Sequence, residues 1–207
     1  MKKIYLLLLI FGSLFFVSCQ KQISPNTTLN TKNKFYNEPQ KELIKVLEVY
    51  DGDTLLAIKN DKQIKIRLYG LDTPETLKET NKNYLAKLEN IYALKAKEYL
   101  SFLVQNTNFE LFLQQISTDH YGRIVGVLSD LYGTNINLKI VENGYGIVYY
   151  INNKKNSKYF STKNKYQENF YYQLIKAQNL ARLDHIQIWQ EKYLSDVFYK
   201  RTNINFD

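Results

Sequence analysis

The sequence contains a single cysteine, Cys19, so no disulfide bond can form within the chain. Its main apolar run, from Ile4 to Val17, is shorter than the roughly 20 apolar residues that a membrane-spanning helix needs. The sequence also has no internal repeat. With 44% hydrophobic and 23% charged residues, the composition is that of a folded globular protein rather than a disordered one.

The first 19 residues have the pattern of an export signal. Lys2 and Lys3 precede the apolar run, and the small residue Ser18 stands directly before Cys19. A cysteine at this point resembles the bacterial lipoprotein signal, in which that cysteine carries the lipid and begins the mature chain. We therefore predict a signal peptide at residues 1–18 and lipidation of Cys19, although Phe16 stands where leucine is commonest. The alternative is an uncleaved membrane anchor, and both interpretations export the domain.

The rest of the chain divides into three parts. Residues 19–40 are rich in Asn, Thr, Lys and Gln without apolar periodicity, which is typical of a flexible tether. Residues 41–195 are long enough for one well-cored domain and too short for a comfortable pair. Residues 196–207 are predicted to be a C-terminal tail.

Acidic residues are outnumbered, because 28 lysines and arginines face 20 aspartates and glutamates, giving a formal net charge of +8. The predicted leader contributes only Lys2 and Lys3 to this excess, so the domain itself is basic. A basic domain favours nucleic acid or anionic lipid as its partner. Residues 152–165 carry several lysines and no acid. They fit either a segment that attracts a polyanion electrostatically or a solvated loop.

Residues 63–71 are predicted to form a strand, in which polar and apolar side chains alternate from Gln63 to Leu68. Ile64, Ile66 and Leu68 share one face, whereas Lys65 and Arg67 lie on the other, as expected for a β-strand. We therefore expect Arg67 to point away from the apolar face and to be available to a surface site.

The order of the other predicted elements indicates a mainly β core with helices on one side. Two short strands surround the Asp51-Gly52 turn between residues 43 and 58, and further strands are predicted at 109–113 and 124–129. Residues 84–104 have the three-and-four spacing of an amphipathic helix, inserted after the third strand. A short helix ends near Gly144, and a last helix, containing Phe170 and Leu174, is expected to pack against Trp189. The prediction is an α+β fold with a five-stranded barrel and about three helices.

The chemically richest stretch runs from Asp51 to Glu75. It contains the motif DGDT at residues 51–54, an arginine fourteen residues after the second aspartate, and DTPE at residues 72–75. A second arginine follows in DHYGR at residues 119–123. Carboxylates at strand ends favour a hard cation, and the arginine beside them favours a phosphate group.

These motifs, in this order and spacing, resemble the staphylococcal nuclease (thermonuclease) family, and the agreement in element order extends to about Trp189. The resemblance implies a five-stranded OB-fold barrel and a calcium ion. It assigns Asp53, Asp72 and the backbone carbonyl of Thr73 as ligands of that ion. Ca²⁺ takes six to eight oxygen ligands, so this set would leave positions for waters and a phosphate oxygen. An aspartate that only caps a turn is the alternative for Asp53, and we expect Asp51 to shape the turn without ligating the ion.

The resemblance also assigns the catalytic groups. Glu75 matches the glutamate proposed as general base toward the attacking water, and Arg67 and Arg123 match two arginines that contact the phosphate. Taken singly, Glu75 could be an acid in the first turn of a helix, and either arginine could belong to a surface ion pair.

Two tyrosines complete the predicted site. Tyr121 and Tyr150 align with tyrosines that line the nucleotide pocket in relatives, where aromatic faces accept any base. Tyr149 could take the place of Tyr150, and His120 is expected to be an exposed spectator.

The expected function is that of an exported Ca²⁺-dependent endonuclease, a hydrolase that cleaves DNA and RNA, prefers single strands and leaves 3′-phosphorylated products. We expect a monomer held on the membrane by its lipid, facing outside the cytoplasm, or secreted if the anchor is cleaved. A non-catalytic OB-fold module that binds single-stranded nucleic acid is the alternative. A lipoprotein for another anionic ligand would leave the spacing of the motifs unexplained.

Overall fold

The computed structural model describes residues 38–154 and 157–201. The predicted signal peptide, Cys19 and most of the predicted tether lie outside the described residues, so they stay predictions. Within the described ranges, no helix combines the length and the apolar character needed to cross a membrane.

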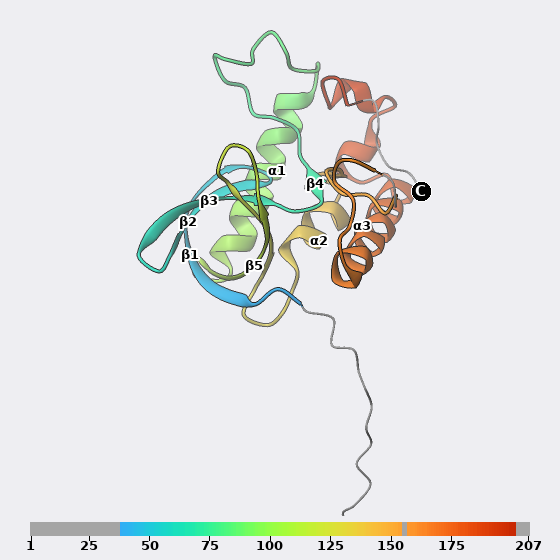
Figure 1. Ribbon diagram of the computed structural model, residues 1–207. Helices are drawn as coiled ribbons and strands as arrows, with labels where there is room; N and C mark the ends of the chain where they lie inside the picture. Colours follow the sequence, from blue (N-terminus) through green and yellow to red (C-terminus); the bar gives the residue numbers. More distant parts are fainter. Residues whose placement is uncertain (1–37, 155–156, 202–207) are drawn as a thin grey trace, which may run out of the picture. The chain divides into compact units, whose positions relative to one another are not determined.

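Five strands close into a barrel, shown in Figure 1, in the order β1-β2-β3-β6-β5. All neighbouring pairs are antiparallel except β3 and β6, which run parallel. This confirms the predicted five-stranded OB-fold barrel. The strands are β1 (Lys41–Asp51), β2 (Thr54–Lys59), β3 (Lys62–Leu68), β5 (Glu110–Thr118) and β6 (Ile124–Ser129).

Strand β1 closes the barrel by pairing with two partners. Its first residues pair with β5 and its later residues with β2, and the register with β2 shifts after Val46 and again after Val49. Such bulges bend and twist a strand, which lets one continuous segment turn the corner of a small barrel. The bend delivers Asp51 to the end of the barrel at which β2 and β3 also present polar side chains.

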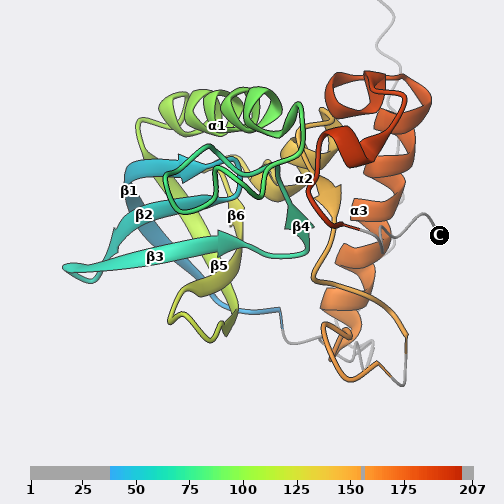
Figure 2. The same cartoon turned by 90° about the horizontal axis from the view of Figure 1, so that it is seen from above.

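Three helices accompany the barrel, as predicted. In Figure 2, α1 runs along the barrel and α2 lies between the barrel and α3. Two short strands, β4 and β7, pair outside the barrel, and two 3₁₀ turns follow α3. The bounds are α1 (Glu89–Gln105), α2 (Ile136–Glu142), α3 (Lys165–Leu183), β4 (Leu71–Asp72), β7 (Ile147–Val148), η1 (Gln187–Gln190) and η2 (Leu194–Asp196).

The first helix begins five residues later than its apolar spacing predicts. The backbone amide of Leu88 donates to the carbonyl of Asp196, and the amide of Ala86 donates to the side chain of Glu89. These contacts hold residues 84–88 outside the helix, and Leu88 packs against the cluster that includes Tyr92 and Trp189.

Asn137 joins α2 to the barrel. Its side chain is fully buried, accepts from the amide of Leu128 at 2.9 Å, and donates to the carbonyls of Tyr69 and Gly126. One amide thus satisfies three backbone groups where β3 and β6 end, which fixes the helix against the strands that carry the site.

A smaller hydrophobic cluster packs the C-terminal segment. Trp189 and Ala181 lie in it together, as predicted for the end of the last helix, and so do Val197 and Phe198, which are 0% and 2% exposed. The packed segment therefore extends past residue 195, where the sequence places the end of the domain.

Candidate active site

Asp53 is delivered to the site by the tight turn between β1 and β2. A Cβ atom on Gly52 would lie 2.5 Å from the Cβ of Ala96 in α1 and 3.0 Å from Oγ1 of Thr73, so the turn can pack here only with glycine. The close packing buries Asp53, which is 1% exposed.

Arg67 joins two buried carboxylates. Its Nη1 donates to Oδ1 of Asp53 at 2.5 Å, and its Nη2 donates to Oδ1 of Asp72. The side chain lies on the face of β3 that the alternation predicts, where it is largely buried and borders the cleft described below. A buried guanidinium is tolerated because it is paired. Burial works to lower the pKa of Arg67, and the charges of Asp53 and Asp72 outweigh it and raise that pKa.

The second oxygen of Asp53 is held by the chain around Thr73. The amide and the hydroxyl of Thr73 both donate to Oδ2 at 2.9 Å, and the hydroxyl of Thr54 donates to Oδ1. Burial raises the pKa of Asp53, the charge of Asp72 adds to the effect, and Arg67 with the Thr73 donors does not fully oppose it. The two carboxylates thus form a position where further positive charge would stabilise both.

Asp72 lies in the short sheet of β4 and β7, opposite Ile147. Gly146, just before β7, allows the close approach, because a Cβ atom there would lie 2.8 Å from the carbonyl oxygen of Asp72. The Oδ2 atom of Asp72 accepts from Nε of Arg201 at 2.7 Å. Asp72 is therefore held between two arginines, one from the barrel and one from the C-terminal segment.

Glu75 lies on the loop after β4 with its side chain partly exposed. Its amide donates to the buried carboxylate of Glu89, at 3.4 Å, and its carboxylate lies 3.6 Å from Nζ of Lys78. Burial raises the pKa of Glu75, the nearby charges of Asp53 and of two further aspartates add to it, and Lys78 opposes them. A carboxylate whose basicity is raised in this way is better suited to accept a proton.

Asp51 ties this loop to the barrel. It accepts from the hydroxyl of Thr76 at 2.5 Å and from Nζ of Lys78 at 3.0 Å. Because both its oxygens are used to position the loop that carries Glu75, Asp51 supports the site without facing the other two aspartates.

Arg123 is positioned by its own turn. Its Nε donates to Oδ2 of Asp119 at 2.7 Å, and its amide donates to Oδ1 of the same residue. Partial burial works to raise the pKa of Asp119, and the hydrogen bonds from Arg123 and from the amide of Tyr121 prevail and lower it. Asp119 thus stays ionised and holds the guanidinium of Arg123 beside the cleft.

Both predicted tyrosines lie against an arginine of the site. The Cζ atom of Arg123 is 5.4 Å from the ring centre of Tyr121, and that of Arg67 is 5.5 Å from the ring centre of Tyr150. Tyr150 has a positive φ of 56°, a conformation that costs a non-glycine residue energy and that here turns its ring toward the cleft. The ring of His120 contacts that of Tyr121 in a tilted arrangement, with 3.7 Å between ring centres, and His120 belongs to the wall of the site.

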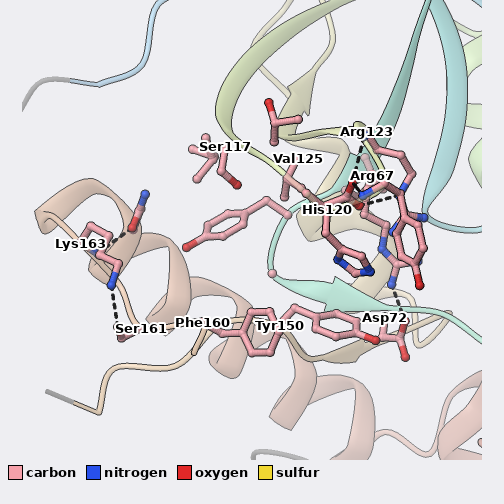
Figure 3. Close-up of a pocket in the computed structure, with 18 of the residues that line it drawn as sticks. Arg67, Asp72, Ser117, His120, Arg123, Val125, Tyr150, Phe160, Ser161 and Lys163 are labelled. Atoms are coloured by element: carbon pink, nitrogen blue, oxygen red, sulfur yellow. Dashed lines mark hydrogen bonds and ion pairs between the residues drawn. The ribbon is translucent and has the colours of Figure 1, made fainter. Parts of the chain in front are cut away.

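A cleft of about 660 Å³ brings the predicted groups together. Figure 3 shows Arg67, Asp72 and Arg123 at one end, and Ser161 and Lys163 at the other. Predicted site residues that line the cleft are Arg67, Asp72, Glu75, Tyr121, Arg123 and Tyr150. Asp53 and Thr73 do not line it, because they are buried behind Arg67. Lys163 places part of the basic 152–165 segment on the cleft wall.

The donor set fits a hard cation. Asp53 and Asp72 offer carboxylate oxygens, the ligands that hard cations prefer, and both carboxylates already contact one positive group, Arg67. Among the described residues, no three acid, histidine or cysteine side chains are grouped so as to hold a metal by themselves. A bound cation would therefore need further oxygen ligands from backbone carbonyls, water or substrate. The groups that now donate hydrogen bonds to Asp53 and Asp72 would also have to release carboxylate oxygens to the cation.

Sequence reasoning missed several residues of the site. Asp119 had a local signal, because an aspartate three residues before a glycine commonly accepts from the following amides in a turn. Glu89 and Arg201 had none, since they reach the site through contacts with residues far away in the chain.

Comparison with known proteins agrees with this geometry. Residues 65–191 match the model of the family described as staphylococcal nuclease homologue. The chain is 32% identical over 145 residues to the endonuclease YhcR of Bacillus subtilis (strain 168), a match that covers 69% of this chain and 11% of that protein. It is 26% identical over 151 residues to the thermonuclease of Staphylococcus hyicus, covering 73% of this chain and 80% of that one. The family model spans more than half of the chain and includes both arginines and Glu75, and so the chain belongs to the staphylococcal nuclease family.

Proposed function

We propose that this protein is a Ca²⁺-dependent endonuclease that hydrolyses DNA and RNA, prefers single strands and leaves 3′-phosphorylated products. The observation that carries the proposal is the convergence of Arg67, Glu75 and Arg123 on one cleft beside Asp72. The names of the two relatives, an endonuclease and a thermonuclease, support the same reaction class.

The two arginines bind the scissile phosphate. A guanidinium presents parallel N–H donors that match two phosphate oxygens, and it stabilises the charge that accumulates on them in the transition state. Asp119 keeps Arg123 oriented for this task. Arg67 is available to a phosphate only when Asp53 or Asp72 finds another positive partner.

Asp53, Asp72 and the carbonyl of Thr73 would hold the Ca²⁺ ion. When bound, the ion would supply positive charge that polarises the phosphate. Glu75 accepts the proton of the attacking water as the water oxygen bonds to phosphorus and the bond from phosphorus to the 5′-oxygen breaks. The departing 5′-oxygen takes a proton from solvent and leaves as a hydroxyl. Tyr121 and Tyr150 stack on bases without selecting among them, which suits unpaired strands.

The substitution Glu75→Gln tests the assignment. We expect it to lower the cleavage rate of denatured DNA by about 10²–10⁴-fold, the usual contribution of a general base. Glu79→Gln is the matched control, because Glu79 lies four residues further on the same loop with its carboxylate in solvent. Equal rates for wild type and Glu75→Gln would refute the role of Glu75.

The alternative function, a non-catalytic module that binds single strands, makes a different prediction. It requires that folded wild-type protein bind denatured DNA and leave it intact with Ca²⁺ present. The retention of Asp53, Asp72, Arg67, Glu75 and Arg123 together favours the enzyme.

We further propose that the enzyme is exported and held to a membrane through lipidated Cys19. The basis is the leader sequence alone. Cys19→Ala should move the protein from the membrane fraction to the soluble fraction after cell breakage, whereas unchanged fractionation would contradict a lipid anchor.

A further inference from the structure

The C-terminal segment contributes a residue to the active site. The family match ends at residue 191, yet the chain continues past it and returns to the two short strands. Val197 and Phe198 are buried in the smaller hydrophobic cluster, and the amide of Tyr199 donates to Glu89 at 3.0 Å. These contacts bring Arg201 to Asp72, 129 residues earlier in the chain.

Arg201 completes the set of donors around Asp72. Asp72 is 1% exposed, its Oδ1 atom accepts from Arg67 and its Oδ2 atom accepts from Arg201. The guanidinium of Arg201 also lies over the ring of Tyr149, with 5.5 Å from Cζ to the ring centre, which fixes its direction. Burial works to lower the pKa of Arg201, and the charge and hydrogen bond of Asp72 prevail and raise it, so the group is a permanent cation.

Arg201 differs from the two arginines assigned to the phosphate. The described residues that line the cleft include Arg67, Arg123 and Asp72 but not Arg201. Its guanidinium contacts the carboxylate of Asp72 and the ring of Tyr149, so its partner in the site is the carboxylate.

We propose that Arg201 is a positioning residue that occupies Asp72 in the cation-free enzyme and competes with Ca²⁺ for it. A cation bound at Asp72 needs carboxylate oxygen that Arg201 now holds, and two positive charges within a few ångströms repel each other. Arg201 thus keeps Asp72 in place before the ion arrives and weakens binding of the ion. The inference rests on the proposed Ca²⁺ dependence.

A purely structural role for Arg201, as a clamp on the C-terminal segment, predicts something else. Loss of such a clamp would lower stability with and without Ca²⁺ and leave the affinity for the ion unchanged. Competition predicts opposite effects: less stability without the ion, and tighter binding of it.

Calorimetric titration of the full-length protein in detergent with CaCl₂ separates the two roles. We expect Arg201→Gln to lower the Kd for Ca²⁺ about tenfold, and Arg201→Lys, which keeps the charge, to lower it less. Lys200→Gln is the control. It also removes one positive charge, from the residue next to Arg201, but the side chain of Lys200 lies over Tyr199 and not at Asp72. Circular dichroism confirms that each variant is folded.

Thermal unfolding gives a second readout. With a chelator present, Arg201→Gln should melt below wild type, and saturating Ca²⁺ should raise its melting temperature more than that of wild type. If wild type binds Ca²⁺ and Arg201→Gln binds it with the same Kd, this inference is overturned and the proposed Ca²⁺ dependence is not. Absence of Ca²⁺ binding in every variant would overturn both it and the proposed Ca²⁺ dependence.

Discussion

Burial of charge dominates this site at the scale of single residues. Asp53, Arg67 and Asp72 are each at least nine-tenths buried. They are tolerated there because Arg67 pairs with both carboxylates and Arg201 supplies a second positive charge at Asp72. The site is therefore a charge-balanced cluster whose members cannot be replaced singly without leaving an unpaired charge. This coupling links the stability of the fold to the chemistry at the cleft.

Arg67 is the first residue that tests this coupling. Arg67→Lys keeps one charge and loses the fork that reaches Asp53 and Asp72 together. We expect cleavage to fall by about 10²-fold, as for removal of one preorganised donor to a transition-state charge. Arg67→Ala, which leaves both acids without this partner, should cost about 3 kcal/mol in the free energy of unfolding. Lys65→Ala, at an exposed position on the same strand, is the control for urea denaturation and for rate.

Asp119 provides a prediction about pH. Its pKa is lowered in the folded protein, so its hydrogen bonds stabilise the fold fully above about pH 4, the ordinary range of the unfolded group. This stabilisation is lost as the pH falls through the lowered folded pKa. At pH 7, Asp119→Asn should therefore unfold at lower urea concentration, by about 1 kcal/mol, and the difference should disappear in strong acid. A difference that persists in acid would contradict the assignment.

At the scale of elements, the short sheet of β4 and β7 positions the carboxylate at the cleft. Each of its strands is only two residues long. By pairing residues far apart in the chain, the sheet brings Asp72 within reach of Arg67. Gly146 makes the pairing possible, since any side chain there would press on the carbonyl of Asp72.

Gly146→Ala tests the importance of that close approach. The added methyl group must move the backbone of Asp72, which we expect to cost about 1–3 kcal/mol in stability, as for other overpacked sites. The same movement should weaken Ca²⁺ binding. Glu142→Ala, four residues earlier at an exposed position, adds no atom near the site and should change neither property. Wild-type stability and Ca²⁺ affinity in Gly146→Ala would show that Asp72 tolerates the shift.

At the scale of the whole molecule, the local features were predictable and the long-range contacts were not. The alternation around Arg67 and the turn at Gly122 depend on neighbours in sequence, so the strands, the barrel and the principal motifs follow from such local patterns. The burial of Arg67 depends on Asp53 and Asp72 closing over it from two other segments. Residue patterns within β3 predict the face on which Arg67 lies and cannot report that closure.

The packing of residues near the C-terminal end also depends on long-range contacts that local sequence patterns do not reveal. Its hydrophobic residues, Val197 and Phe198, are too few to reveal a periodicity, so the sequence reads as a tail. They are buried because they meet Trp189 and Ile147 across the smaller cluster. The position of Arg201 follows from that packing and from no local pattern.

The central claim is that this basic domain cleaves nucleic acid when Ca²⁺ is present. The most direct measurement follows the length of a denatured DNA strand over time with wild-type protein, in CaCl₂ and in excess chelator. We expect progressive shortening to fragments that end in 3′-phosphate with CaCl₂, and an intact strand with chelator. An intact strand in both, from folded protein that still binds it, would contradict a nuclease and leave a binding module.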